Sequence, residues 1–321
     1  MSGPTSFTYK ISDEQSSRLK ALLVTKGFTF NEVPHAEFAA SKDKLTIVMY
    51  RSRKLLLQGK PAREFIEFVL EPEILKEARL GYEDVLEPDR IKPRIGVDES
   101  GKGDFFGPLT AAGVYVNPSV VEQMAELGVR DSKSVSSDKK IAELANAIRK
   151  IDGCVIEVVT IGNEAYNRLY RTMKSVNRIL AWAHARVIEN LLGRRYQMKP
   201  EPERVICDQF AATEKTVKNA LMGLGREVEI IQRHKAESDL AVAAASIMAR
   251  DAFVKGLGSL GQKMNAVLPK GASARVEDVG REIVAKHGVE ILEKVAKTHF
   301  RTAYRIKGLP EPPKSPWRGK G

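Results

Sequence analysis

The spacing of hydrophobic residues predicts a small α+β unit at the start of the chain. Leucines recur on one face of a predicted helix over residues 13–26, and Ser12 stands where an N-cap is favoured. Strand-like runs follow at residues 45–50 and 54–59, and the short connection between them predicts a hairpin. We assign this pattern to a first domain over residues 1–85.

From Arg94 onward, hydrophobic runs of strand length alternate with longer helical patterns. The predicted strands cover residues 94–98, 110–116, 154–160, 204–208 and 227–232. The predicted helices cover residues 137–150, 164–192, 213–221, 238–257 and 275–286. Because strands that alternate with long helices favour a mixed α/β sheet covered by helices, we expect one such domain over residues 86–307. A proline-rich, flexible tail is expected over residues 308–321.

Composition places the protein among globular proteins. The chain has 321 residues, of which 43% are hydrophobic, and no run approaches the roughly 20 apolar residues of a membrane span. The N-terminus lacks the pattern of a secretory signal, and the two cysteines lie far apart inside strand-like runs. We therefore expect a cytoplasmic protein with reduced thiols and no membrane association.

A formal net charge of +11 favours a polyanionic partner. Basic residues are dense around the predicted hairpin, where residues 42–63 hold seven Lys or Arg and one acid. This density can be a solvated face or a platform for backbone phosphates. We favour the platform, with Arg51, Arg53 and Lys54 as substrate-binding residues.

Two adjacent carboxylates, Asp98 and Glu99, follow an apolar strand and precede the turn Ser100-Gly101-Lys102-Gly103. Successive residues of a strand point to opposite faces, so we expect the strand to break at this turn and bring both acids into one site. Buried carboxylates need a counter-charge, and Mg²⁺ prefers carboxylates together with substrate oxygens and water. The glycines would let the backbone approach a phosphate or ribose.

Two further acids stand in similar apolar contexts. Asp208 ends a predicted strand, and Glu237 precedes an Ala-rich helix, although either acid could serve only as a turn or cap residue. Ser132 and Lys133 stand before a helix as capping residues or phosphate contacts. Among the histidines, His184 is interpreted as structural and His234 as a weak candidate for proton transfer.

The string GVDESGKGDFFGPLTAAGVYV at residues 96–116 closely resembles the first catalytic motif of prokaryotic type 2 ribonucleases H. Its Gly-Lys-Gly form resembles ribonuclease HIII, whereas ribonuclease HII usually has Gly-Arg-Gly at that place. The Asp-Ser-Lys segment at residues 131–133, the strand ending at Asp208 and the Lys-Ala-Glu segment at residues 235–237 are similar to further family motifs. Asp239 rivals Glu237 as the fourth acid, because ribonuclease HII commonly has Asp where Glu237 stands.

The resemblance implies a ribonuclease H-like mixed sheet with flanking helices and an N-terminal domain similar to the TATA-binding protein. It implies an endonuclease that cuts the RNA strand of RNA–DNA hybrids with two Mg²⁺ or Mn²⁺ ions, leaving 5′-phosphate and 3′-hydroxyl ends. The implied catalytic and metal-binding residues are Asp98, Glu99, Asp208 and Glu237. The implied substrate contacts of this domain are Ser100, Gly101, Lys102, Gly103, Ser132, Lys133 and Lys235.

Within this assignment the Gly101–Gly103 backbone would contact ribose 2′-hydroxyls, which distinguish RNA from DNA. We expect alanine at Gly101 or Gly103 to reduce cleavage strongly and to change thermal stability little. The N-terminal domain would hold the hybrid without cutting it, and the protein would act as a monomer. A non-catalytic nucleic-acid-binding protein and an enzyme that cuts at single ribonucleotides embedded in DNA remain the alternatives.

Overall fold

The structure is a computed structural model that describes residues 6–77, 91–129, 132–135, 137–208, 220–221, 223–233 and 236–312. The chain divides into two compact units, Met1–Arg90 and Ile91–Gly321. Among the residues described, no helix is both long and apolar enough to cross a membrane. The predicted tail beyond residue 312 and most of the predicted helix at residues 213–221 lie outside the described residues.

The first unit is a five-stranded antiparallel sheet with helices packed on it. Its strands are β1 (Ser6–Lys10), β2 (Thr29–Asn31), β3 (Ala36–Lys42), β4 (Leu45–Tyr50) and β5 (Lys54–Gln58), in the order β1-β5-β4-β3-β2. Its helices are α1 (Asp13–Thr25), α2 (Ala62–Phe65) and the π-helix η1 (Ile66–Leu75). Leucines of α1 and η1 pack with Ile47 and Leu57 of the sheet in one hydrophobic core.

The first helix and the hairpin of this unit follow the sequence prediction. Ser12 caps α1 in a capping box, since its hydroxyl accepts from the Gln15 amide and the Gln15 side chain accepts from the Ser12 amide. Strands β1, β2 and β3 were not predicted. β2 has only three residues, all exposed, so no alternation of buried and exposed positions marks it.

The second unit is built on a mixed sheet in the order β10-β9-β6-β7-β8. Its strands are β6 (Arg94–Ser100), β7 (Leu109–Val116), β8 (Val155–Ile161), β9 (Arg204–Asp208) and β10 (Glu229–Arg233). β6, β9 and β10 run parallel, and β7 pairs antiparallel with both of its neighbours. The C-terminal ends of β6, β8, β9 and β10 therefore lie at one edge of the sheet. The mixed α/β sheet was predicted.

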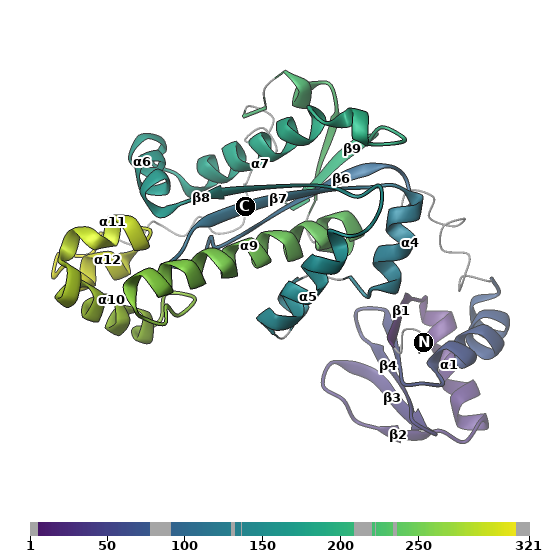
Figure 1. Ribbon diagram of the computed structural model, residues 1–321. Helices are drawn as coiled ribbons and strands as arrows, with labels where there is room; N and C mark the ends of the chain where they lie inside the picture. The colour runs from purple at the N-terminus through teal and green to yellow at the C-terminus, as the bar shows by residue number, and fades with distance from the viewer. Residues whose placement is uncertain are drawn as a thin grey trace. The chain divides into compact units, whose positions relative to one another are not determined.

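Helices cover both faces of this sheet. The longer ones are α4 (Pro118–Glu126), α5 (Asp138–Ile148), α6 (Asn163–Met173), α7 (Val176–Leu192), α9 (Leu240–Met264) and α10 (Ala274–His287). α7 lies on one face and α9 on the other (Figure 1), each with its own hydrophobic cluster. The shorter helices α11 (Leu292–Val295) and α12 (Arg301–Ile306) pack with α10 and the end of α9 around Phe105 and Phe106.

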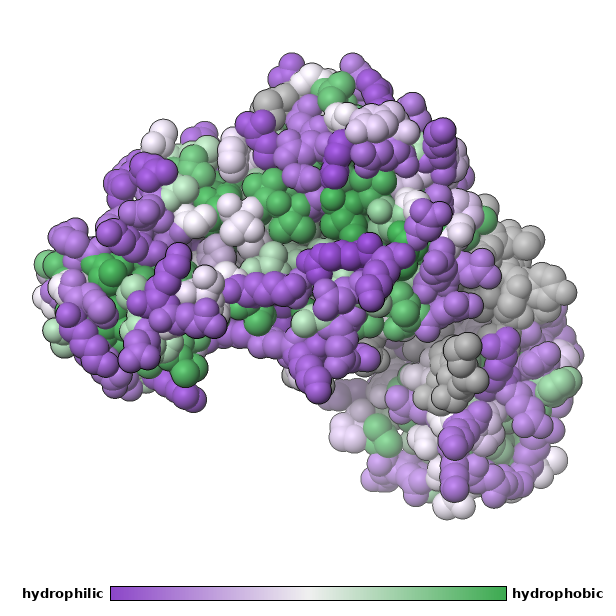
Figure 2. Space-filling view, in the orientation of Figure 1, coloured by the Kyte–Doolittle hydropathy of each residue, from purple (hydrophilic) through white to green (hydrophobic). Residues whose placement is uncertain are grey.

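Hydrophobic side chains are visible in the band between α7 and α9 (Figure 2), where the edge strand β8 runs. Ile156 and Val158 of β8 are half-buried there. β8 is the last strand of its sheet, so no further strand of the described chain covers this edge.

The single helix predicted over residues 164–192 is wrong. The chain forms α6 and α7, which are separated where Lys174 adopts a left-handed conformation with φ 53°. Ser175 then caps α7 by accepting a hydrogen bond from the Arg178 amide. The break lets both helices pack on the sheet, while the hydrophobic spacing in the sequence runs through it without a glycine or proline.

Candidate active site

Asp98 and Glu99 lie at the C-terminal end of β6, but the strand does not break there as predicted. β6 stays paired with β7 through Ser100, whose partner is Thr110. The two carboxylates therefore leave from opposite faces of one regular strand. Glu99 extends to the side of α7, and Asp98 hydrogen bonds with Ser246 on α9. The two side chains still share a site, because the sheet ends here and one cavity extends over both of its faces at this edge.

The contact between His184 and Glu99 is not predicted from the sequence. His184 lies in the middle of α7, is 0% exposed, and places its Nε2 3.0 Å from Glu99 Oε2. The sequence shows only a histidine among small apolar residues of a helix, which is the pattern of a core position. The structural interpretation of His184 was therefore incomplete, because this buried ring fixes the direction of the Glu99 carboxylate.

The two neighbouring carboxylates differ in protonation. Burial raises the pKa of Asp98 to about 8, with the charge of Glu99 as the second cause. Burial alone would also raise the pKa of Glu99, but the hydrogen bond with His184 and the charges of His184, Lys102 and Lys133 lower it. Near neutral pH the proton of the pair is therefore favoured on Asp98, and a nearby cation would favour ionisation of both carboxyls.

Asp208 comes to the same sheet edge from β9. Val97 of β6 pairs with Cys207 of β9, so the next residues, Asp98 and Asp208, leave adjoining strands at the same level. Parallel partners point to the same face, which places both carboxylates on the α9 side. The Asp208 Oδ1 accepts a hydrogen bond from the Ala236 amide at 3.5 Å. This contact brings the backbone of Glu237, the next residue, close to Asp208.

The rival acid Asp239 is used elsewhere. Its Oδ2 accepts a hydrogen bond from Arg94 Nε at 2.8 Å, and its Oδ1 caps α9 at the Ala241 amide at 2.9 Å. Arg94 and Asp239 are both buried, so they form an internal ion pair that joins the start of β6 to the start of α9. The side chain of Glu237 and all of His234 and Lys235 lie outside the described residues.

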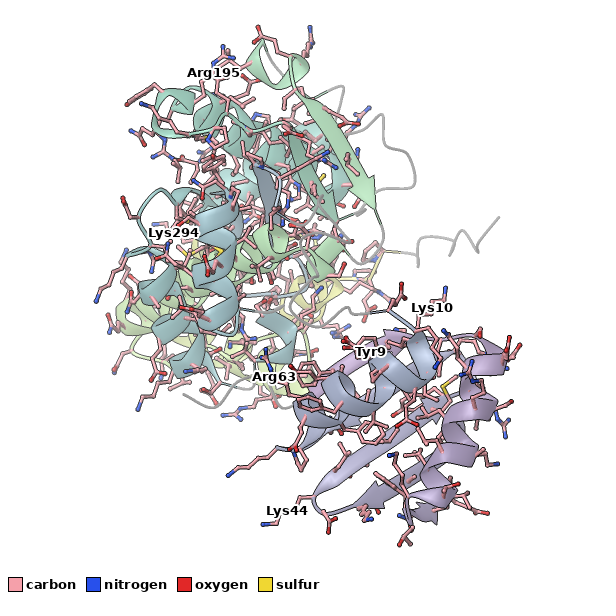
Figure 3. The ribbon with its side chains drawn as sticks, turned by 90° about the vertical axis from the view of Figure 1, so that its right-hand side faces the viewer. Tyr9, Lys10, Lys44, Arg63, Arg195 and Lys294 are labelled. Atoms are coloured by element: carbon pink, nitrogen blue, oxygen red, sulfur yellow. The ribbon has the colours of Figure 1, made fainter. Side chains whose placement is uncertain are left out.

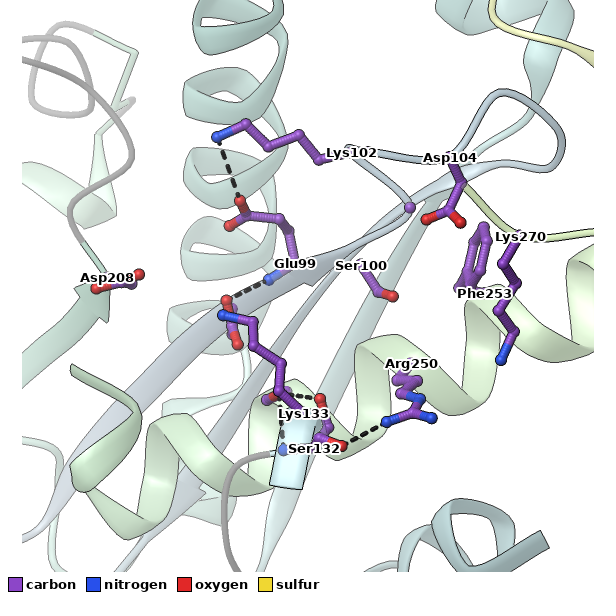
Figure 4. A pocket seen from close by; sticks show the side chains of 14 residues that line it. Glu99, Ser100, Lys102, Asp104, Ser132, Lys133, Asp208, Arg250, Phe253 and Lys270 are labelled. Atoms are coloured by element: carbon purple, nitrogen blue, oxygen red, sulfur yellow. Dashed lines mark hydrogen bonds and ion pairs between the residues drawn. The ribbon is translucent and has the colours of Figure 1, made fainter. Parts of the chain in front are cut away.

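A cavity of about 580 Å³ joins these features. Asp98, Glu99 and Asp208 line it together with the turn from Ser100 to Asp104. Lys102, Lys133, Arg250 and Lys270 bring positive charge to its wall (Figure 4). Acids at the sheet edge with cations around them suit a phosphodiester, because the cations attract its charge and the acids need a metal ion to approach it.

Arg250, Lys270 and Ser246 were not among the predicted site residues. Arg250 donates to the carbonyls of Ser132 and Val135, and Arg250 and Lys270 both pair with Asp138. Their roles depend on contacts between distant segments, and no local motif marks them. Ser132, a predicted substrate contact, is buried, and its hydroxyl hydrogen bonds with Ser246. Lys133 is exposed beside it.

The two glycines of the turn differ, which corrects one expectation. Gly101 has φ +89°, and a Cβ placed there would lie 2.3 Å from the Pro108 carbonyl oxygen. Alanine at Gly101 would therefore strain the fold itself, contrary to the expectation of little change in stability. A Cβ on Gly103 would meet no described heavy atom within 4 Å.

The donor set fits a divalent cation in its chemistry. Three carboxylates line one cavity, and a cation there would oppose the burial and the Glu99 charge that raise the pKa of Asp98. Within the described part of the chain, no group of three His, Cys, Asp or Glu side chains is already gathered as a metal site. Asp208 stands apart from the pair on β6 (Figure 4), and the Glu237 side chain is not described.

The predicted basic residues of the first unit differ in availability. Arg51 and Lys54 are exposed on the β4–β5 hairpin. Arg53 instead pairs with Asp13 and Glu37, so its charge is largely neutralised. Lys44, at the β3–β4 turn, extends away from the sheet (Figure 3).

Two protein families match this chain, one in each of its two units. The family described as Ribonuclease HII matches residues 95–303, and the one described as Domain of unknown function (DUF3378) matches residues 6–78. The chain is 42% identical over 310 residues to ribonuclease HIII of Chlamydia muridarum (strain MoPn / Nigg), covering 95% of this chain and 98% of that protein. It is 43% identical over 306 residues to ribonuclease HIII of Chlamydia pneumoniae, covering 93% and 97%.

Solved structures similar to this chain are also ribonucleases of this type. The crystal structure of Bst-RNase HIII in complex with Mn²⁺ is similar with a TM-score of 0.66 and 30% identity, covering 95% of this chain and 98% of that one. Aquifex aeolicus RNase H3 is similar with a TM-score of 0.53 and 26% identity, covering 91% and 98%. With relatives of this identity matched over nearly their whole length, the chain belongs to the ribonuclease HIII family.

Proposed function

We propose that the protein is an endoribonuclease that hydrolyses the RNA strand of RNA–DNA hybrids with two divalent metal ions, leaving 5′-phosphate and 3′-hydroxyl ends. The observation that carries this proposal is the cavity in which Asp98, Glu99 and Asp208 end two adjoining strands beside four cationic side chains. Membership of the ribonuclease HIII family and the similarity to an RNase HIII in complex with Mn²⁺ support the reaction and the metal.

The residues of the chain would divide the work. Asp98, Glu99, Asp208 and Glu237 would hold Mg²⁺ or Mn²⁺, and His184 would keep the Glu99 carboxylate in place. When bound, the ions would activate water and neutralise charge on the departing oxygen. Lys102 and Lys133 would attract the phosphodiester, and the backbone of Gly101 and Gly103 would approach the ribose.

Both units would contact the substrate. In the second unit, Ser100 and Ser132 line the cavity and Lys235 precedes the segment that contacts Asp208, so these residues would complete its substrate contacts. Arg51 and Lys54 of the first unit would contact backbone phosphates, with Arg53 contributing less because it is paired. We expect the protein to act as a monomer.

The direct test is a cleavage assay of the purified protein on three duplexes: an RNA–DNA hybrid, an RNA–RNA duplex and a DNA duplex with one ribonucleotide. We expect cleavage of the hybrid alone, in Mg²⁺ or Mn²⁺, with loss on adding EDTA. D98N and D208N should bind the hybrid but cut it at least about 100-fold more slowly. Cleavage restricted to the single ribonucleotide, or undiminished cleavage by both variants, would contradict the proposal.

A further inference from the structure

Lys297 is a buried lysine that the proposed reaction does not use. It is 0% exposed and follows α11 by two residues, about 200 positions after the glycine turn in the sequence. Its ammonium donates to the Asp104 carbonyl at 2.9 Å and the Gly107 carbonyl at 2.6 Å. It also lies 5.7 Å from the centre of the Tyr166 ring.

The backbone around Lys297 pairs with the same loop. The Lys297 amide donates to the Phe105 carbonyl at 2.8 Å, and the Gly107 amide donates to the Val295 carbonyl at 3.1 Å. Residues 104–107 connect the glycine turn to β7, so these backbone hydrogen bonds fix the loop to the segment that follows α11. Asn163 of α6 also donates to the Gly107 carbonyl, so two distant segments of the chain hold the loop.

Asp104 connects Lys297 to the turn. Its carbonyl accepts from the Lys297 ammonium, while its amide donates to the Gly101 carbonyl at 3.3 Å. Its carboxylate accepts from the Gly271 amide at 2.7 Å. Asp104 is therefore the single residue that links the Lys297 ammonium to Gly101, the residue whose left-handed conformation shapes the turn.

A charged group at this place is costly. Desolvation of an ammonium costs several kcal/mol, whereas a methionine of similar length would pack in the same space without that cost. The shape of the core alone does not require lysine. The requirement is for a donor, because two carbonyls of one loop point toward the same place: the Lys297 ammonium donates to the Asp104 carbonyl and shares the Gly107 carbonyl with Asn163.

We propose that Lys297 is a positioning residue that holds the Gly101–Gly103 turn in the geometry that recognises the RNA strand. The inference rests on the proposed function of the turn. Lys297 contacts the loop and not the substrate, so it would act by preventing a small displacement of the turn. A misplacement of about 1 Å at such a site can cost roughly 100-fold in rate.

The test compares K297M with N167A in the full-length protein. Asn167 anchors the same segment by donating to the Ala296 carbonyl and accepting from the Thr298 amide, so its side-chain hydrogen bonds go to that segment and not to residues 104–107. We expect K297M to lower kcat/KM on the hybrid by about 10- to 100-fold per folded molecule, and N167A to lower it much less. Equal losses in the two variants would assign Lys297 a purely structural role and overturn the proposal.

A double-mutant cycle with G103A adds a readout that a structural role would not move. If Lys297 acts through the turn, the two substitutions are coupled. The fold reduction in kcat/KM of the double variant K297M with G103A should then be clearly smaller than the product of the fold reductions of the two single variants. Strictly multiplicative losses would overturn the proposal. Should K297M fail to fold, K297Q, which keeps a donor without the charge, takes its place in the same cycle.

Hydrogen exchange separates this inference from the proposed function, because it needs no substrate. The Asp104 amide should exchange faster in K297M than in the wild type, and N167A should leave it nearly unchanged. If the wild type cut no hybrid, the proposed function would fail, while the exchange rates would still decide whether Lys297 holds the turn. Unchanged exchange in K297M would refute the positioning role.

Discussion

At the scale of single residues, the two acids near the start of α9 have different surroundings. Asp239 has both carboxylate oxygens engaged, one by Arg94 and one by the first turn of α9. Glu237 follows Ala236, whose amide donates to Asp208. The sequence left the fourth acid open between these two, because it shows two carboxylates two residues apart without showing which of them Arg94 reaches.

The first prediction separates the roles of these two acids. E237Q should abolish cleavage and leave unfolding nearly unchanged, because we expect its carboxylate to hold metal. D239N should lose about 3 kcal/mol of unfolding free energy or more, because it leaves the Arg94 guanidinium buried without its charged partner. Urea unfolding and single-turnover cleavage of both variants measure these outcomes. An inactive, fully stable D239N together with an active E237Q would reverse the assignment.

The glycine turn gives a second prediction at this scale. G101A should lower the melting temperature, since the added Cβ would lie 2.3 Å from a backbone carbonyl oxygen and Gly101 has a positive φ. G103A should keep the wild-type melting temperature, because open space surrounds that position, yet cleave the hybrid at least about tenfold more slowly. G128A is a control for the backbone strain in G101A: Gly128 also has a positive φ, but open space surrounds its Cβ position and it lies outside the cavity. Wild-type cleavage by G103A would show that its backbone does not press on the ribose.

At the scale of elements, the sequence predicts what periodicity and local chemistry determine. The β4–β5 hairpin, α1 with its Ser12 cap and the five strands of the second sheet all carry such signals. The break between α6 and α7 carries none, because Lys174 is an ordinary helix former that adopts a left-handed conformation there. The continuation of β6 through Ser100 was missed for a related reason, since pairing with Thr110 outweighs the turn-forming residues that follow.

The residues of the candidate site likewise divide into those that the sequence predicts and those that it does not. Asp98, Glu99 and Asp208 could be predicted because each follows an apolar strand. His184 and Arg250 could not, since each acquires its role from a residue on a distant element, namely Glu99 and the segment at Ser132. Local sequence reports which residues are able to do chemistry, and the topology decides which of them meet.

The segment after α11 provides a prediction about pH. Burial lowers the pKa of Lys297 from 10.5 to about 7, with the nearby charge of Asp104 opposing the shift. Between these two values the unfolded chain binds one more proton than the folded protein, so unfolding free energy rises with pH. Relative to K297M, the wild type should gain about 2 kcal/mol of unfolding free energy from pH 7.5 to 9.5. Urea unfolding at these pH values measures the difference.

A matched variant controls for the other titrating groups. Lys294 lies three residues earlier and is exposed (Figure 3), so K294M should follow the wild-type pH dependence. If K297M and the wild type gained the same free energy over this range, Lys297 would not titrate near neutral pH in the folded protein.

At the scale of the whole molecule, the chain combines two units with separate cores. The first unit packs its sheet against α1 and η1, and the second packs around α7 and α9. The proposed catalytic carboxylates all lie in the second unit. The first unit instead offers exposed basic residues such as Arg51 and Lys54. This division suggests that one unit holds the substrate while the other cuts it.

This division predicts the effect of removing the first unit. Deleting residues 1–85 should leave a folded second unit, because the hydrophobic clusters of that unit contain no residue of the first. KM for the hybrid should rise while kcat changes little, since holding shared by the ground and transition states is uniform binding.

Salt provides the sharper readout of the same prediction. The affinity of the full chain should fall more steeply with salt than that of the truncated chain, because each phosphate contact releases counterions. Within the full chain, R51E combined with K54E should flatten the slope toward the truncated value. R53E should change it less, since Arg53 is already paired with Asp13 and Glu37. Filter binding or fluorescence anisotropy of catalytically inactive D98N across a salt series gives these slopes. Equal slopes for the full and truncated chains would mean that the first unit does not contact the phosphate backbone, and its basic residues would then serve solubility alone.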